Sequence, residues 1–204
     1  MDTAALITAF VTLFVVIDPV GLAPVFVALT AGEDFAHRRA VAFRACLIGF
    51  GILLVFGLAG EAVLEFVGIS MPAFRIAGGI LLFLTALDML FERRTKRRGD
   101  QRAKADDPSV FPLATPLIAG PGAIATMILL TSRPGADLQW ALAVYGVMAG
   151  VVLICLVLFL ASGLLERLLG PTGINVVTRL LGMLLAALSV QFVLDGLSDF
   201  GVAA

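Results

Sequence analysis

Charged residues are scarce in this chain, which contains only 14% Asp, Glu, Lys and Arg against 60% hydrophobic residues. A soluble domain usually carries about 25% charged and about 45–50% apolar residues. With 204 residues and a mean hydropathy of +1.07, the chain has more apolar surface than one core can bury. The composition therefore excludes a soluble globular domain and predicts a polytopic protein with the lipid bilayer as its main solvent and partner.

Histidine and cysteine are almost absent. His37 is the single histidine, and Cys46 and Cys155 are the two cysteines. Each cysteine lies inside an apolar run, which favours two buried free thiols over a disulfide or a redox pair. One histidine without a cysteine cluster predicts neither a metal site nor a hydrolase triad. We therefore expect no enzyme activity, no metal and no cofactor.

Six apolar segments are long enough to cross a membrane, for which a helix needs about 20 residues. The first segment is too long for a straight crossing, because a helix over residues 4–30 would reach roughly 40 Å. A helix break near Asp18 and Pro19 would take up the excess length. The pattern predicts an all-α fold with spans at 4–30, 39–59, 71–91, 112–132, 138–163 and 174–196.

The two halves of the chain repeat each other. A shift of 102 positions lays 17-IDPVGLAPV-25 over 119-AGPGAIATM-127, and a shift of 104 lays 75-RIAGGILLFLTAL-87 over 179-RLLGMLLAALSVQ-191. Each half contains three spans, so the second half must enter the membrane from the opposite side. The sequence therefore predicts two inverted three-helix repeats, at 1–91 and 112–204, joined by a basic cytoplasmic loop at 92–111. Many secondary transporters have this organisation.

Basic residues predict the orientation. Twelve of the 14 lie on one predicted side, seven of them in the central loop, and only Arg75 and Arg133 lie on the other. Because basic loops stay in the cytoplasm, we expect the central loop inside and both termini outside the cytoplasm. The basic run could instead bind nucleic acid or lipid head groups. Without a soluble domain around it, the topological interpretation is favoured and no nucleic-acid partner is expected.

The two predicted helix breaks are the candidate binding site. A carboxylate inside a span costs about 2.5–3.5 kcal/mol, which makes Asp18 a functional candidate. Asp followed by Pro is also a helix start, so Asp18 could serve only as an N-cap. The second break has Gly120 at the equivalent position and no acid. Two half-helix N-termini would meet near the membrane midplane with their partial positive charges. The candidate solute- or ion-binding residues are Asp18, Pro19, Gly21, Pro24, Gly120, Pro121, Gly122 and Thr126.

Two arginines occupy equivalent positions in the repeat. Arg75 and Arg179 lie near opposite faces of the membrane and could gate a path or anchor their spans. Snorkelling of the side chain to head groups is the alternative. Gly78, Gly79, Gly182 and Gly196 are predicted to permit close packing of helices.

Four motifs together resemble the MarC family of bacterial integral membrane proteins. They are DPVGLAPVF at 18–26, PAFRIAGG at 72–79, PLIAGPGAI at 116–124 and QFVLDG at 191–196. The resemblance implies a small six-span carrier fold of the lysine-exporter superfamily and a location in the bacterial inner membrane. It names no substrate. Another branch of that superfamily moves reducing equivalents through cysteines beside the prolines of spans one and four, where this chain has none.

Two functions from different classes fit these observations. The first is a small secondary transporter of an unknown small solute, an exporter among the options, working by alternating access around spans one and four. The second is a non-transporting membrane scaffold or accessory subunit, in which the breaks serve only packing. Small-residue faces such as Gly78-Gly79 also permit a homo-oligomer.

Overall fold

The computed structural model describes residues 3–91, 107–133, 135 and 137–201, and these form helices without a strand. Five helical segments are long and apolar enough to cross a membrane, or up to six if one bent pair counts as a single span. The chain is therefore an all-helical, multi-pass protein, as predicted. Most of the central basic loop, 92–106, lies outside the described residues.

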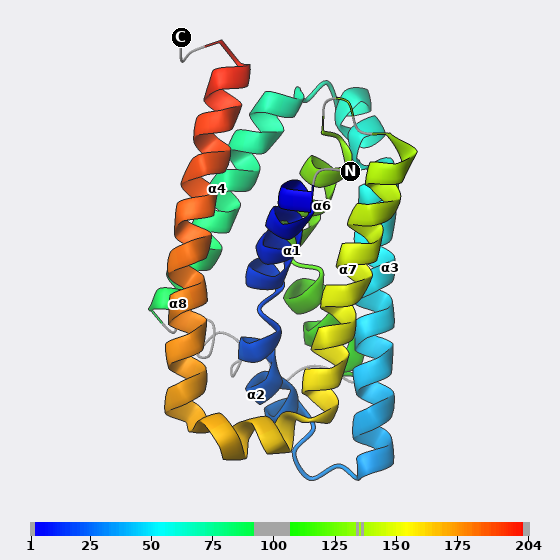
Figure 1. Ribbon diagram of the computed structural model, residues 1–204. Coiled ribbons are helices and arrows are strands. Elements are labelled where there is room, and N and C mark those ends of the chain that lie inside the picture. The colour runs from blue at the N-terminus through cyan, green and yellow to red at the C-terminus, as the bar shows by residue number, and fades with distance from the viewer. Residues whose placement is uncertain (1–2, 92–106, 134, 136, 202–204) are drawn as a thin grey trace.

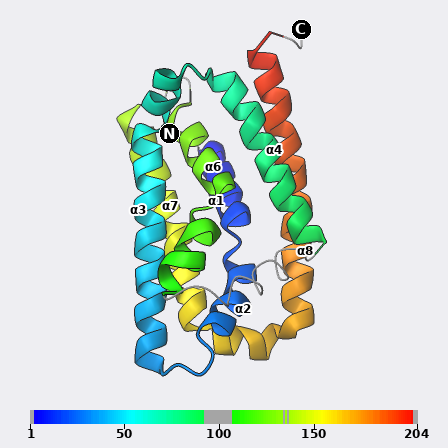
Figure 2. The ribbon, with the colours of Figure 1, turned by 180° about the vertical axis from the view of Figure 1, so that it is seen from behind.

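The central part of the bundle consists of four short helices (Figure 1). Two come from the first half, α1 (Thr3–Ile17) and α2 (Pro19–Leu29). Two come from the second half, the irregular η2 (Ser109–Ile118) and α6 (Pro121–Thr131), which are bent by 53° relative to each other. Viewed from behind, η2 and α6 stand in front of α1 and α2 (Figure 2).

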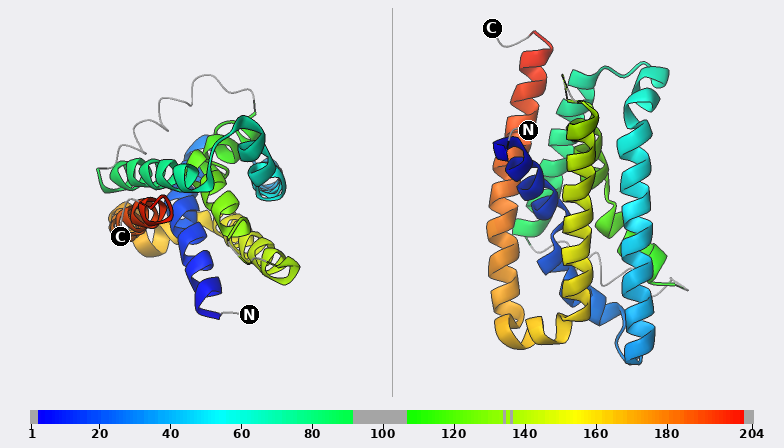
Figure 3. Two further views of the ribbon diagram at one scale, coloured as in Figure 1. Left: turned by 90° about the horizontal axis from the view of Figure 1, so that it is seen from above. Right: turned by 45° about the vertical axis from the view of Figure 1, so that its right-hand side comes forward.

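Long helices flank this central group on two sides. On one side stand α3 (Phe35–Val67) and α7 (Leu138–Leu160), and on the other α4 (Met71–Leu90) and α8 (Ser162–Asp199). The view from above separates the two pairs, with the central helices between them (Figure 3). Each pair therefore joins one helix from each half of the chain.

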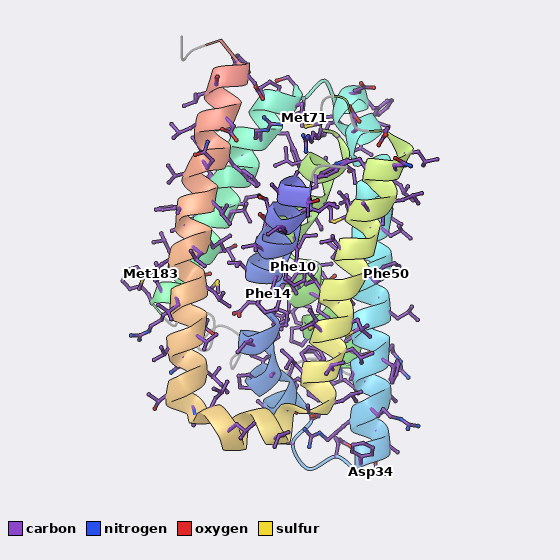
Figure 4. All side chains as sticks on the ribbon, viewed as in Figure 1. Phe10, Phe14, Asp34, Phe50, Met71 and Met183 are labelled. Carbon is purple, nitrogen blue, oxygen red and sulfur yellow. The ribbon has the colours of Figure 1, made fainter. Side chains whose placement is uncertain are left out.

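The boundaries of α3 follow from its caps, and they extend beyond the predicted span at both ends. The Asp34 carboxylate accepts a hydrogen bond from the His37 amide at 2.7 Å, and Asp34 lies at the lower end of the bundle (Figure 4). The helix ends at Gly68, whose φ of 81° is the left-handed conformation typical of a C-cap. Span prediction by hydropathy missed the residues after 59 because Glu61 and Glu65 interrupt the apolar run without breaking the helix.

The bend in α8 has a local cause. Gly170 has φ 61° and ψ 173°, and Pro171 follows it without an amide to donate. The part of α8 before the bend lies across the lower end of the bundle, and the longer part rises beside α4 (Figure 1). The end of α8 and the start of α1 consequently lie toward the same end of the bundle.

Buried aromatic and apolar side chains join the lower part of α2 to α7. Phe26 and Phe159 are stacked with ring centroids 4.7 Å apart and an interplanar angle of 4°. The guanidinium of Arg38 lies 5.7 Å from the centroid of Phe26 and donates to the Ser162 hydroxyl at 3.3 Å. These contacts bring α2, α3, α7 and α8 together at one end.

The outer faces of the long helices are apolar and exposed. Phe66 on α3 is 92% exposed, and Met183 on α8 is 56% exposed and points away from the bundle (Figure 4). In water such surfaces would be unfavourable, and a bilayer solvates them instead.

Glycines let α4 and α8 approach each other closely, as the sequence predicted. A Cβ on Gly79 would lie 2.8 Å from the Ser189 carbonyl oxygen, and one on Gly196 would lie 3.0 Å from the Pro72 carbonyl oxygen. The equivalent contact of Gly182 is with Met89, at 3.0 Å. Backbone therefore packs against backbone along this pair, and even a methyl group would force the helices apart.

Gly79→Ala is expected to destabilise the protein by about 1–3 kcal/mol, the usual effect of overpacking a close contact. Gly51→Ala is the matched control, because a Cβ there meets nothing within 4 Å. Alanine is the better helix former by roughly 0.5–1 kcal/mol, so the control should keep or raise the melting temperature. Thermal unfolding in detergent, followed by circular dichroism, measures both. Equal shifts in the two variants would contradict the α4–α8 contact.

Candidate functional site

Asp18 is the single residue between α1 and α2, and it is fully buried. Its backbone is left-handed, with φ 55° and ψ 61°, and it is the one residue other than glycine with positive φ among those described. The Asp18 amide donates to the Phe14 carbonyl at 2.9 Å, and its own carbonyl accepts from the Leu22 amide at 3.0 Å. The chain thus changes direction at one residue while the backbone hydrogen bonds continue on both sides.

The carboxylate of Asp18 caps α2. Its Oδ1 accepts a hydrogen bond from the Gly21 amide at 3.0 Å, and Pro19 occupies the first helical position, where no amide is needed. The carboxylate lies so close to Gly21 that a Cβ there would be 2.1 Å from Oδ2. Gly21 is therefore required by the cap itself. Further along α2, Pro24 removes one donor from the helix interior, so the Val20 carbonyl loses its helical partner.

The second break has a different construction. Ala119 and Gly120 separate η2 from α6, and Gly120 is the N-cap of α6 without any side-chain hydrogen bond. Pro121 follows at the first helical position, as Pro19 does in α2. A Cβ on Gly120 would lie 2.6 Å from the Pro116 carbonyl oxygen, which explains the glycine.

The segment before this break is irregular because of its prolines. Pro112 and Pro116 lie four residues apart in η2, and the residue before each is extended rather than helical. Phe111 has φ −130° and ψ 124°, and Thr115 has φ −130° and ψ 125°, the region that a following proline favours. Sequence reasoning placed the break only at Gly120. The proline spacing in the sequence was the signal for this longer irregularity.

The starts of the two half-helices lie in one neighbourhood. A Cβ on Gly122, in the first turn of α6, would lie 3.4 Å from Cγ1 of Val16, two residues before Asp18. The same position would lie 2.9 Å from Cδ2 of Leu82 and 3.8 Å from Oγ1 of Thr85, both on α4. The first turn of α6 therefore lies against the end of α1, two residues before Asp18, with α4 beside both.

Thr126 is buried with an unused hydroxyl. It is 0% exposed, and its Oγ1 has no hydrogen-bond partner among the described residues. Other threonines in these helices donate to the carbonyl four residues earlier: Thr12 to Thr8 at 2.8 Å, and Thr131 to Met127 at 2.9 Å. The hydroxyl of Thr126 is therefore a buried polar group in the second turn of α6 that no described residue satisfies.

The two cysteines, which the sequence did not connect, lie together. Both are buried and free, Cys46 on α3 and Cys155 on α7. The thiol of Cys155 lies close enough to interact with the thiol of Cys46 and, more weakly, with the carboxylate of Asp18. A sequence spacing of more than a hundred residues gives no local signal for this contact. The available hint was that they lie in corresponding spans, two and five, of the predicted repeat.

Arg75 and Arg179 lie on α4 and α8, outside the two interrupted spans. Arg75, near the start of α4, forms an ion pair with Asp199, the last residue of α8. Arg179 is exposed on α8. Among the described residues, no group of three His, Cys, Asp or Glu side chains could hold a metal ion.

The chain matches the MarC family of integral membrane proteins over residues 3–200. It belongs to that family. A UPF0056 membrane protein of Archaeoglobus fulgidus is 40% identical over 195 residues, covering 94% of this chain and 91% of the relative. Two Escherichia coli K12 proteins are also similar. The UPF0056 membrane protein YhcE is 36% identical, and the match covers 92% of this chain and 89% of the relative. The UPF0056 inner membrane protein YhgN is 35% identical, and the match covers 94% of this chain and 95% of the relative.

The resemblance found in the four motifs is thereby confirmed. The MarC relatives occur in archaea as well as bacteria, so family membership alone does not assign a bacterial source. No solved structure matches the chain. The family description and the relatives' names state a membrane location and no substrate.

Oxidation tests the contact between the thiols. Diamide should remove one hydrogen from Cys46 and one from Cys155, forming a disulfide while its own N=N bond takes up both hydrogens. In a chain with a protease site inserted between residues 92 and 106, the cleaved halves should then stay joined on a non-reducing gel and separate on reduction. Cys155→Ser is the control and should give separate halves throughout. Separation of the oxidised parent protein would contradict the contact.

Proposed function

We propose that this MarC-family protein is a secondary transporter of a small solute that works by alternating access around α1/α2 and η2/α6. The observation that carries the proposal is the placement of a fully buried carboxylate and an unsatisfied hydroxyl, Asp18 and Thr126, at two interrupted helices. Polar groups and irregular backbone inside a membrane are unfavourable unless protein or a water-filled path covers them. Interrupted spans of this kind are typical of transporter binding sites.

The packing of the half-helices supports the inverted repeat. The half-helix α2 packs against α7 and α8 of the second half, and α6 packs against α3 and α4 of the first half. The sequence shifts that relate the halves pair α2 with α6, α7 with α3 and α8 with α4, so the two sets of contacts correspond. Each broken span is therefore held by the other half's long helices, so a relative movement of the flanking pairs would act on both breaks together.

The proposed orientation rests on the basic residues. The end of the bundle that carries the start of α3, with Arg38, Arg39 and Arg44, is assigned to the cytoplasm with the central loop. An ion pair of 2.7 Å between Arg44 and Asp107 joins this end of α3 to the segment entering η2. The two termini then lie outside the cytoplasm. Arg75 is assigned an anchoring role there through Asp199, and Arg179 an equivalent one near the opposite face.

Accessibility of Thr126 tests transport without knowledge of the solute. In a background of Cys46→Ala and Cys155→Ala, we expect Thr126→Cys to react with a small impermeant thiol reagent, because alternating access must open the break to water. Met89→Cys is the control, since Met89 is 1% exposed and packs against Gly182 of α8 near the end of α4. Reaction at least about tenfold faster at Thr126 is the expected result. Equal, slow reaction of both variants would favour the non-transporting scaffold.

The orientation is tested with the same reagent on intact cells. In the cysteine-free background, Asp100→Cys should resist labelling from outside, and Ala203→Cys should react, because the basic loop stays in the cytoplasm. Permeabilised cells provide the control and should label both. The reverse pattern would overturn the orientation, and equal labelling in intact cells would indicate dual topology.

A further inference from the structure

We propose that Arg38 is a gating residue, which holds Phe26 of α2 against Phe159 of α7 and thereby closes the lower end of the bundle. Release of Arg38 lets α2 move away from α7 and admits water toward the break at Asp18. The inference deepens the proposed transport function and rests on it for what passes through the opening. The opening itself can be measured without a solute.

Two stacked rings lie below the break, toward the lower end of the bundle (Figure 1). Phe26 follows Asp18 by eight residues, which is about 12 Å along a helix. Phe159 is the last residue but one of α7. Both rings are 1% exposed, and their parallel stacking leaves no room for water between them. The stack therefore separates the break from the lower surface along the α2–α7 contact.

Arg38 reaches this stack from a third helix. It lies in the first turn of α3, and its guanidinium carbon is 5.7 Å from the centroid of Phe26. A cation over an aromatic ring is attracted to the negative face of the ring, and more strongly where water is excluded. The same guanidinium donates to the hydroxyl of Ser162, a fully buried residue at the start of α8. Arg38, Phe26, Phe159 and Ser162 together form the lower gate.

The upper end of the bundle is joined differently. There α6 packs against α3, in the contact that corresponds to α2 against α7. The hydroxyl of Thr131, the last residue of α6, donates to the backbone carbonyl of Gly57 at 3.0 Å. A Cβ on Gly60 would lie 2.4 Å from Cγ1 of Ile128. The side chains of α6 thus touch the backbone of α3 directly, so this contact opens only if the helices themselves move apart.

The lower gate can open with a smaller rearrangement. It consists of a ring stack, a cation–π contact and a hydrogen bond between two side chains, and side chains change rotamer without movement of their helices. Arg38 lies close to a helix end, where its long side chain can turn to water or lipid head groups. The half-helix α2 is joined to α1 by the single residue Asp18, which provides a hinge for its movement. The geometry therefore makes the lower end the one that opens first.

Cys155 is a natural reporter for this opening. It lies one turn before Phe159 on α7, so the two side chains lie on the same face of the helix. Its thiol is fully buried and lies near the carboxylate of Asp18, between the stack and the break. Cys46→Ala leaves Cys155 as the only cysteine of the chain. Its thiol should be shielded while the gate is closed and should react when water enters from below.

Thiol reactivity of Cys155 tests the gate. Full-length Cys46→Ala protein in lipid nanodiscs, which leave both ends accessible, is treated with a small cationic methanethiosulfonate. The reagent converts an accessible thiol into a mixed disulfide with release of methanesulfinate, and mass spectrometry follows the reaction.

Arg38→Ala should raise the reaction rate of Cys155 about tenfold or more, equivalent to about 1.4 kcal/mol in favour of the open state. Arg39→Ala is the matched control, because it removes the same charge from the neighbouring, exposed position of α3. The control should react as the parent does. An unchanged rate in Arg38→Ala, or an equal rise in Arg39→Ala, would overturn the proposal.

A second reporter separates a local opening from a general loss of stability. Val144 is as fully buried as Cys155 and lies eleven residues earlier on the same helix, toward the upper end. In a background of Cys46→Ala and Cys155→Ala, the reaction rate of Val144→Cys should be the same with and without Arg38→Ala. Equal acceleration at both reporters would show general loosening of the bundle and overturn the gate.

Milder variants test the contacts of the guanidinium one at a time. Ser162→Ala removes the acceptor and leaves the cation over the ring, so Cys155 should react faster than in the parent and more slowly than in Arg38→Ala. Arg38→Lys keeps the charge without the planar group and should restore part of the closure. If Arg38→Ala does not fold, Ser162→Ala decides instead, and a rate equal to that of the parent would overturn the proposal.

The gate and the transport function can fail separately. Cys155 reports the gate, and Thr126→Cys in the background without native cysteines reports access to the second break. Faster reaction of Cys155 in Arg38→Ala, with Thr126→Cys unreactive throughout, would support the gate and contradict transport. A reactive Thr126→Cys, with Cys155 unaffected by Arg38→Ala, would support transport and overturn the gate.

Discussion

The hydrogen bond from the Gly21 amide to the Asp18 carboxylate is the interaction on which the centre of this MarC protein depends. It lets a helix restart inside the bundle, at a residue whose left-handed backbone is unfavourable for most residues but is tolerated by aspartate, whose short side chain can hydrogen-bond locally. The carboxylate satisfies a buried donor, and the donor stabilises a buried carboxylate. Gly21 and Pro19 follow from this arrangement, because a Cβ would collide with the carboxylate and an amide at the first position would lack an acceptor.

The long helices make this interruption possible by covering it. Buried backbone groups at a break need protein or water around them, and here α7 and α8 cover α2 while α3 and α4 cover α6. Close packing of α4 on α8 relies on Gly79, Gly182 and Gly196, where backbone or the first side-chain carbon of the partner helix occupies the space of a Cβ. The flanking pairs and the short central helices thus have different structural roles, the first in packing and the second in presenting polar groups.

The two breaks differ in a way that sequence similarity between the halves conceals. The first contains its own carboxylate, Asp18, as the cap of α2, and the second has Gly120 as the cap of α6 without a side-chain hydrogen bond. A repeat that had retained the acid in both halves would place two carboxylates in one neighbourhood, which is unfavourable. The second half-helix therefore starts without a side-chain cap of its own, and neighbouring residues pack closely against its glycines.

The sequence by itself determined the membrane class, the family, the all-helical fold and the helix starts at Asp18 and Gly120. Hydropathy over about 20 residues and the Asp-Pro and Gly-Pro pairs are local signals, because they reflect transfer to lipid and the backbone preferences of single residues. Only the tertiary structure decided that Cys46 meets Cys155, that Arg75 pairs with Asp199, and that the Thr126 hydroxyl has no partner among the described residues. These features join residues distant in sequence, or depend on which way one hydroxyl turns. Neither hydropathy nor residue spacing predicts such contacts, because these contacts form only when helices from the two halves pack together.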